Sequence, residues 1–380
     1  MKYYRIFVVM SVVLLGLITG CGPKPAPQKS LLDTPENHYN QGMRELDKGN
    51  LEDAADEFGR ATALDPDYPG GYVGMGLVWA EKGDFKEALN SVDKGIKKDK
   101  DRPASYVAKG RILTTQKKGD EWIEDAVKPF EKALDLDPDN EEALFYLGLA
   151  YKEAFQFASA VSSFSQVVAQ KKDFAGRANR EWELVQKIIR AAPGTRIGKE
   201  IALMPEIDRS DLAVLFIEEL KLVEVLKRYQ PQTYDTEFRP PSESDGANDN
   251  ADTLPEDVEN HWAKNWIKDV LAAGAMDLFP DGNFGPDVAV TRANYARFIQ
   301  NIIVAVSGDQ SLKTKYVGSE SRFPDVNASH YAYNAICLAV DRGVMQADTI
   351  RGTFRMSDTV SGADALLIVR KLQNALRMTF

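Results

Sequence analysis

Histidine and cysteine carry much of the acid–base, nucleophilic and metal chemistry of proteins, and this 380-residue chain has three histidines and two cysteines. They are His38, His261, His330, Cys21 and Cys337, and they are scattered along the chain. Zinc sites need clustered ligands, and the sequence also lacks a nucleophile elbow, a Walker loop and an HExxH helix. We therefore expect a protein without enzyme activity, metal or cofactor.

Two of the histidines belong to repeated elements. His261 and His330 occupy equivalent positions of two related segments, 69 residues apart, which favours a structural role at a helix start over catalysis. Cys337 follows Ile336 within an expected helix and is predicted to be a buried, inert thiol. We expect no disulfide between Cys337 and Cys21, because Cys21 has a better use at the N-terminus.

The charged residues are unevenly distributed. The formal net charge is −10, which argues against general nucleic-acid binding. Residues 35–174 contain 19 basic and 27 acidic side chains, and residues 231–253 contain 1 and 6. Residues 254–380 contain 13 and 14 and are close to neutral. An anion-binding site in the C-terminal part must therefore be a local feature.

The N-terminus has the pattern of a secretory signal. Lys2 and Arg5 precede an apolar run from Ile6 to Ile18. This run is shorter than the ~20 residues that span a bilayer, and it fits the apolar core of a signal peptide. It leads into LITGC, which resembles the lipobox of bacterial lipoproteins. An ordinary signal peptide followed by a chance cysteine is the alternative.

The lipobox resemblance implies that residues 1–20 are a signal peptide and that Cys21 is lipidated and becomes the mature N-terminus. Acyl chains on Cys21 would anchor the protein to a membrane surface, with residues 21–34 as a proline-rich spacer. Gly22 follows the cysteine, and in a cell with two membranes the resemblance to sorted lipoproteins favours the outer membrane. The expected location is the cell envelope, on its periplasmic or surface face.

Residues 35–174 repeat with a period of 34. The second-helix pattern A-x3-F-x2-A-x4-P covers residues 54–66, and counting back places a small helix-packing residue at Gly42. The unit that contains Gly110 has a four-residue insertion near residues 117–121. The pattern resembles the tetratricopeptide (TPR) repeat. It implies about four helical hairpins stacked into a solenoid, which binds an unidentified protein partner in a concave groove.

Two C-terminal segments carry a different repeat. Residues 254–306 contain DVENHWA, the loop FPDGNFGP and the helix start VTRANYA. Residues 323–378 contain FPDV, HYA, GTFR and VSGAD in the same order. Both resemble the S-layer homology (SLH) domain. We expect two helices per unit, with Asp257 or Asp325 just before the first and Thr291 or Ser361 capping the second.

Residues 175–230 allow two interpretations. IDRSDLA, from Ile207, matches the start of the second SLH helix, but the Pro-Asp-Gly loop is missing. The segment is either a degenerate third SLH repeat or a helical cap on the TPR array. Residues 231–253 are acidic, proline-rich and poor in aliphatic side chains, which predicts a flexible linker. The expected fold class is all-α, with a TPR solenoid followed by helical SLH modules.

The SLH resemblance implies binding to cell-wall polysaccharide, often pyruvylated, or to a peptidoglycan-linked polymer. An arginine at a helix start can hold a carboxylate bidentately, which makes Arg292 the first candidate and Arg209 its counterpart in the weak copy. Trp262 is a candidate for stacking on a sugar face. Gly282 and Asn283 are candidates for donating loop N–H groups to the ligand.

The last copy departs from this pattern, because Gly362 replaces the arginine. Arg355, in the neighbouring loop, is a candidate substitute. A structural alternative exists for each main candidate: Arg292 as a surface ion pair, and Trp262 as a core residue.

Together these features predict a non-enzymatic envelope protein that acts as a tether or scaffold. Lipid would hold it at a membrane, the SLH units would bind wall polymer, and the TPR array would bind a protein. The alternative is an accessory factor for the assembly of an envelope secretion or pilus system, working mainly through the TPR groove. A wall-modifying enzyme is disfavoured because no catalytic constellation is present.

Overall fold

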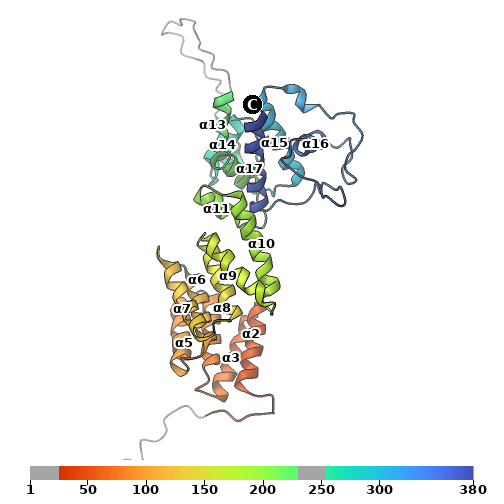
Figure 1. Ribbon diagram of the computed structural model, residues 1–380. Helices are drawn as coiled ribbons and strands as arrows, with labels where there is room; N and C mark the ends of the chain where they lie inside the picture. The colour runs from red at the N-terminus through yellow and green to blue at the C-terminus, as the bar shows by residue number, and fades with distance from the viewer. Residues whose placement is uncertain (1–24, 230–253, 380) are drawn as a thin grey trace, which may run out of the picture. The chain divides into compact units, whose positions relative to one another are not determined.

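The structure, a computed structural model, describes residues 25–229 and 254–379 (Figure 1). Regular secondary structure in these residues is helical, and two isolated β-bridges are its only extended pairings. The helices form two compact units, and the boundary between them lies between Asn179 and Arg180, within helix α10 (Ala175–Ala191). The predicted all-helical fold class is therefore confirmed. The signal peptide, Cys21 and the linker 231–253 lie outside the described residues.

Unit 1, the described residues up to Asn179, is a series of helical hairpins (Figure 1). Each hairpin pairs two helices that follow one another in the chain, and short turns join the hairpins. The helices are α2 (Pro35–Asp47), α3 (Leu51–Leu64), α4 (Pro69–Glu81), α5 (Phe85–Lys98), α6 (Pro103–Gln116), α7 (Trp122–Leu136), α8 (Glu141–Glu153) and α9 (Phe157–Gln170).

Small residues allow the two helices of a hairpin to approach closely. A Cβ atom added to Gly42 would lie 2.5 Å from the ring of Phe58, which is fully buried. The same contact joins Gly110 to Phe130 and Gly148 to Phe164, with Cβ-to-ring distances of 2.6 Å in both. In the second hairpin Gly76 meets Val92 in the same way, at 2.5 Å. Each hairpin thus has a glycine packed on a buried apolar side chain, which is phenylalanine in three of the four.

The third hairpin contains the predicted insertion. Residues 117–121 join α6 to α7, whereas three residues join the helices of each other hairpin. Lys117 and Gly119 turn the chain there with φ of 45° and 81°. Helices α6 and α7 are each one residue longer than α4 and α5, so the insertion is shared between the connection and both helices.

The segment just before α2 is attached to unit 1, although we expected a free spacer up to residue 34. Ala26 N–H donates to the carbonyl of Ala63 (2.6 Å), and Arg60 donates to Pro27 O (3.0 Å). Asp33 is 8% exposed and pairs with Arg60 and His38. The described part of the predicted spacer 21–34 therefore packs on α3, where Asp33 supplies a carboxylate to Arg60.

Unit 2 contains three consecutive segments, which we call segment A (180–229), segment B (254–308) and segment C (323–379). Segment A holds the rest of α10, α11 (Arg196–Ala202), α12 (Arg209–Glu218) and α13 (Leu222–Tyr229). Segment B holds the 3-10 helix η2 (Glu256–Val258), α14 (Lys264–Ala272) and α15 (Arg292–Ser307), and segment C holds α16 (Tyr333–Asp341) and α17 (Gly362–Thr379). The short helix η3 (Gln310–Lys313) lies between B and C.

A closed triangle of backbone hydrogen bonds joins the three segments. Ile207 N–H donates to Val360 O (3.0 Å), Val360 N–H to Val290 O (3.1 Å), and Val290 N–H to Ile207 O (2.9 Å). All three residues are nearly or fully buried, and each stands two positions before a helix: α12, α15 or α17. Segment A thus occupies the position in unit 2 that the repeat pattern gives to B and C.

The residue after each member of the triangle is a helix N-cap. The side chains of Asp208, Thr291 and Ser361 accept hydrogen bonds from backbone N–H groups three residues later. The predicted caps at Thr291 and Ser361 are confirmed.

The third helix start differs from the other two at its first residue. Gly362 N–H donates to Met204 O (3.0 Å), and a Cβ atom at Gly362 would overlap the carbonyl of Ile201, at the end of α11. Only glycine fits this approach of α17 to segment A. In the repeat pattern Gly362 stands in place of an arginine, and the structure shows that glycine is a packing requirement at this position.

We predict that Gly362→Ala destabilises unit 2 by about 2 kcal/mol, because the methyl group must displace the α11 backbone. The unfolding midpoint of unit 2 should fall by about 4–8 °C in calorimetry of the full chain. Gly59→Ala is the control: that position lies in α3 with open space around it, so alanine should stabilise unit 1 slightly. An unchanged unit 2 transition in Gly362→Ala would refute the close contact.

Candidate functional site

Arg292, the main binding candidate from the sequence, joins segment B to segment C. Its Nε donates to Phe354 O and its Nη2 to Gln346 O, both at 2.8 Å. The guanidinium carbon lies 4.6 Å from the centre of the Phe354 ring. Burial lowers the pKa of this guanidinium. Arg292 is therefore half-buried and holds the loop of the following segment through backbone carbonyls.

Arg209 makes the same contacts one segment earlier. Its Nε donates to Phe284 O (2.7 Å) and its Nη2 to Asp277 O (2.5 Å), in the loop of segment B. It lies over the Phe279, Phe284 and Phe298 rings and is only 3% exposed. Burial lowers its pKa to about 10. We therefore withdraw Arg209 as a glycan ligand, because its side chain is enclosed between segments A and B.

An aspartate near the start of segments B and C fixes the same loops from the other side. Asp257 accepts the N–H groups of Phe284 (3.2 Å) and Gly285 (2.6 Å). Asp325 accepts those of Phe354 (2.8 Å) and Arg355 (2.6 Å). They were expected just before the first helix of each unit, but Asp257 lies within η2, Asp325 lies well before α16, and the partners of both are in the loop.

The loop donors proposed from sequence are engaged within the loop. Gly282 N–H donates to Phe279 O (2.9 Å), and Gly282 has φ of 87°. The backbone N–H and side-chain amide of Asn283 donate to the Asp281 carboxylate at 3.0 and 3.1 Å. Gly282 and Asn283 shape the turn, and their N–H groups are not directed at a ligand.

Trp262 lies at the surface, as its candidate role requires. It is 54% exposed, and its ring centre is 5.9 Å from that of Trp266. The equivalent residue of segment C, Tyr331, is 66% exposed and donates to Asn294 Oδ1 (3.2 Å). The core alternative for Trp262 is therefore wrong.

A groove of about 470 Å³ opens beside Arg292. Four cationic side chains from three segments line it: Lys187 on α10 of segment A, Arg292 on α15 of segment B, and Arg355 and Lys371 of segment C, in the loop and on α17. We call it the basic groove. Its remaining lining is Val344, Met345, Gln346, Asp358, Thr359, Val360, Asp364, Leu367 and Ile368. Cations with aliphatic side chains among the lining suit an anion carried on a partly apolar body.

The four cations are neutralised to different degrees. Lys187 Nζ is 2.8 Å from Asp364 Oδ1, and Arg355 Nη1 is 3.6 Å from Asp358 Oδ2 at an exposed position. Lys371 forms no ion pair with any residue that the structure describes. The four cations face two carboxylates, so the groove carries a local positive charge within a nearly neutral segment, as the charge distribution required.

Sequence reasoning missed Lys187 and Lys371. Lys187 lies on α10, in segment A, and it reaches the groove only because the triangle brings segment A beside segment C. Lys371 stands where segment B has Asn301, so it has no counterpart in the repeat pattern.

The two repeat histidines and Cys337 have structural roles. His261 and His330 lie three residues before α14 and α16, and their Nδ1 atoms accept the N–H groups of Ala263 and Ala332. Cys337 is fully buried, as predicted. Among the described residues no cluster of histidine, cysteine and carboxylates could hold a metal, and no helix has the length and apolarity to cross a membrane.

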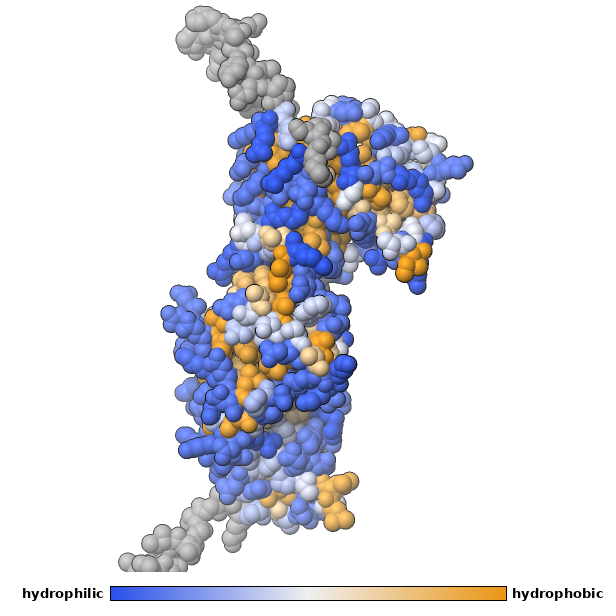
Figure 2. Space-filling view, in the orientation of Figure 1, coloured by the Kyte–Doolittle hydropathy of each residue, from blue (hydrophilic) through white to orange (hydrophobic). Residues whose placement is uncertain are grey.

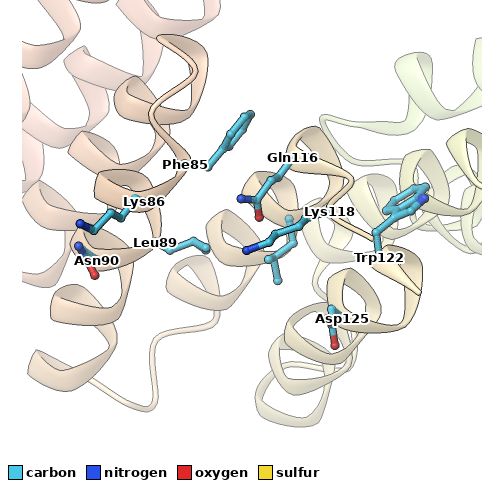
Figure 3. A pocket seen from close by; sticks show the side chains of 9 residues that line it. Phe85, Lys86, Leu89, Asn90, Gln116, Lys118, Trp122 and Asp125 are labelled. Atoms are coloured by element: carbon cyan, nitrogen blue, oxygen red, sulfur yellow. The ribbon is translucent and has the colours of Figure 1, made fainter. Parts of the chain in front are cut away.

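Unit 1 has two hollows of its own. One, of about 440 Å³, lies at the insertion and is lined by Phe85 and Leu89 of α5, Trp122 of α7 (Figure 3) and Leu113 of α6. Lys86 and Lys118 stand at its edge, and Lys118 extends toward Leu89. The inserted connection therefore forms part of a largely apolar hollow whose charged lining residues are Lys86, Lys118 and Asp125.

The second hollow of unit 1, of about 330 Å³, is lined mainly by α4, α6 and α8. The guanidinium of Arg111 lies 4.2 Å from the centre of the Tyr146 ring and 3.7 Å from Glu142. Leu77, Ala80 and Leu149 make its walls apolar. On the face shown in Figure 2, apolar residues gather in an interrupted band on unit 1. These features suit an amphipathic polypeptide.

Comparison with known families agrees with the two kinds of repeat. Residues 39–105 match the tetratricopeptide repeat family, and residues 123–154 match a further TPR repeat family. Residues 256–296 and 322–366 match the S-layer homology domain. Segment A lies between the matched stretches.

Comparison with individual proteins gives partial likenesses. Cell surface glycoprotein 1 of Acetivibrio thermocellus is 26% identical over 117 residues, which are 30% of this chain and 5% of the glycoprotein. A thermophilic TPR protein of Thermus thermophilus aligns at 15% identity with a TM-score of 0.37, covering 51% of this chain and 96% of that one. PilF of Pseudomonas aeruginosa aligns at 16% identity with a TM-score of 0.32, covering 51% and 91%.

Asp211 in segment A and Asp364 in segment C occupy equivalent helix positions, but we expect them to change the stability of unit 2 in opposite directions as the pH rises. Burial raises the pKa of Asp211 to about 6. Burial also raises the pKa of Asp364, but hydrogen bonds from Lys187 and Ser361 outweigh it and lower the pKa overall. A raised carboxyl pKa costs stability as pH rises through about 6, whereas a lowered one contributes stability above the unfolded pKa.

We therefore predict that Asp211→Asn raises the unfolding midpoint of unit 2 at pH 8, by the equivalent of about 1–2 kcal/mol, and has little effect at pH 4. Asp364→Asn should lower the midpoint at pH 8. Segment B already has asparagine here, at Asn294. Calorimetry of the full chain at both pH values measures the effect, and the same sign in both variants at pH 8 would contradict the assignment.

Proposed function

We propose that this chain, which carries TPR repeats and two SLH domains, is a non-enzymatic tether or scaffold of the cell envelope. The observation that carries the proposal is the basic groove, which lies in the SLH-bearing unit of a chain that also has a TPR array. SLH domains bind cell-wall polymers and TPR arrays bind proteins. Both are binding modules, in keeping with a role without catalysis.

We propose further that segment A is a degenerate third SLH repeat rather than a cap on the TPR array. The backbone triangle, the N-cap at Asp208 and the arginine at the helix start support this, because they repeat features of segment B. Segment A also lies in the same compact unit as B and C. Its contribution is a wall of the basic groove, through Lys187.

The ligand we propose is an acidic wall polysaccharide, for example one with a pyruvyl ketal. A ketal presents one carboxylate beside an apolar methyl group, and the groove is lined by cations together with Leu367 and Ile368. Trp262 lies outside the residues that line this groove, so its proposed role is a separate stacking contact with a sugar ring.

The membrane end of the proposed tether is Cys21. Lipidation there would place the protein at a membrane facing the wall, which is the outer membrane if the cell has two. The likeness to a cell surface glycoprotein supports an envelope location. Residues 25–34 pack on unit 1, so little chain would separate the lipid from the TPR array.

A second candidate function is an accessory role in the assembly of an envelope secretion or pilus system. The two apolar hollows of unit 1 favour it, because together they offer separate sites for a polypeptide partner. In that case the SLH unit would position the TPR array at the wall. A reproducible secretion or pilus component retained by the full chain, and lost in Leu89→Glu or Leu149→Glu, would support this candidate.

The wall-binding proposal predicts that the purified full chain sediments with sacculi that carry their wall polysaccharide and stays in solution with stripped sacculi. Arg292→Ala should reduce the bound fraction several-fold, because the groove loses a cation and its loop support. Arg351→Ala, at an exposed arginine of the same loop, is the control and should bind normally. Wild-type protein that remains in the supernatant would refute wall binding.

The anchoring proposal predicts that Cys21→Ser releases the protein from membranes, because the thiol that carries the lipid is lost. The measurement is the distribution of the full-length protein between membrane and soluble fractions of cells that express it. Metabolic labelling with a fatty acid should be lost in the same variant. Lipidation would be contradicted if Cys21→Ser stayed in the membrane fraction as the wild type does and the wild type incorporated no labelled fatty acid.

A further inference from the structure

Unit 2 has three related joints between segments, but they differ in the side chains that an anion could reach. Each joint packs a second-helix start against the following segment: Arg292 against C, Arg209 against B and Gly362 against A. We propose that only the Arg292 joint, which forms the basic groove, binds the acidic glycan. We further propose that Lys371 and Arg355 contact the anion, while Arg292 is a positioning residue. This inference rests on the proposed wall-binding function.

The joint at Arg209 supplies the comparison that assigns a role to Arg292. Both arginines use Nε and Nη2 on two carbonyls of the next loop, and both stack on a phenylalanine whose carbonyl they bind. Arg209 does this at 3% exposure, where no ligand reaches it. The contact between the arginine and the loop carbonyls therefore joins two segments, and it forms without a bound anion.

The positions that make the Arg292 joint basic are occupied by neutral residues at the Arg209 joint. Asn301 stands where segment C has Lys371, and Gly285 stands where it has Arg355. The cation nearby, Arg297, is already occupied: its Nη2 is 2.9 Å from Asp277, and its guanidinium lies 5.4 Å from the Tyr331 ring centre. An anion entering there would compete with an ion pair.

The third joint is closed by different contacts. Gly362 lies against the end of α11, as described above. Arg370, the residue before Lys371, donates to Ala191 O (2.8 Å) and Ala192 O (2.6 Å) and pairs with Glu219 at 2.9 Å. The Glu219 side chain is only 1% exposed. This cation is therefore used to join segment C to segment A.

Two cations of the basic groove remain available to a ligand. Arg355 is exposed, and its nearest carboxylate is 3.6 Å away. Lys371 has no ion pair within the described residues and lies on α17 one turn beyond Leu367 and Ile368. Lys187 is paired with Asp364, so its charge is largely balanced. A carboxylate held by Arg355 and Lys371 would rest on aliphatic side chains.

The test is titration calorimetry of the full chain with a 4,6-pyruvyl ketal of a hexopyranoside, with the neutral hexopyranoside as the blank. We expect one site per chain. Lys371→Ala and Arg355→Ala should each weaken binding about tenfold, because each removes a charge-assisted contact. Asn301→Ala and Arg297→Ala, at the first joint, should bind as the wild type does.

Salt dependence separates direct contact from positioning. Lys371→Ala should flatten the dependence of affinity on NaCl concentration, because a cation that touches the ligand is gone. Arg292→Gln should weaken binding with the wild-type salt dependence and should also lower the unfolding midpoint of unit 2. A salt dependence flattened as much by Arg292→Gln as by Lys371→Ala would overturn the positioning role.

Two or three sites per chain, or weakening by Arg297→Ala equal to that of Lys371→Ala, would overturn the single-groove assignment. Absence of any ketal binding by a chain that still sediments with wall sacculi would also overturn this inference, while leaving the tether in place. Loss of sedimentation itself would instead refute the proposed function.

Discussion

The backbone triangle of Ile207, Val290 and Val360 is the constraint on which unit 2 depends. Each residue gives one N–H and one carbonyl to the ring, so three buried chain segments satisfy one another without a sheet. Each is followed by an N-cap and a helix, so the ring also sets where α12, α15 and α17 begin. The basic groove follows from this placement, since Lys187 and Lys371 are distant in sequence and meet only through it.

The joints around the triangle explain why arginine recurs at the helix start. A guanidinium has a fixed fork of donors, is weakly hydrated and stacks on aromatic rings, so it suits two carbonyls beside a phenylalanine better than lysine does. The third joint has glycine, because α11 replaces the loop and its backbone fills the space. The three joints are therefore related but not interchangeable, because the joint that closes segment C on segment A requires glycine in place of arginine.

Much of this was predictable where a local pattern encodes a local structure. The period of 34, the insertion at 117–121 and the caps at Thr291 and Ser361 all depend on neighbours within one hairpin or one turn. The role of Arg292 was not predictable, because a helix-start arginine looks the same whether its fork meets a carboxylate or a carbonyl. Lys187 was missed because its partner, Asp364, lies far along the chain and leaves no periodic signal.

The choice of carbonyl acceptors has a consequence for binding chemistry. If the joints were held by arginine–carboxylate pairs, each would place an anion next to the groove and repel an acidic ligand. Backbone carbonyls hold Arg292 and Arg209 with dipoles only, so the joint adds no negative charge. The two carboxylates that do line the groove face four cations. The surface beside Arg292 can therefore stay positive, because this joint is held through backbone carbonyls.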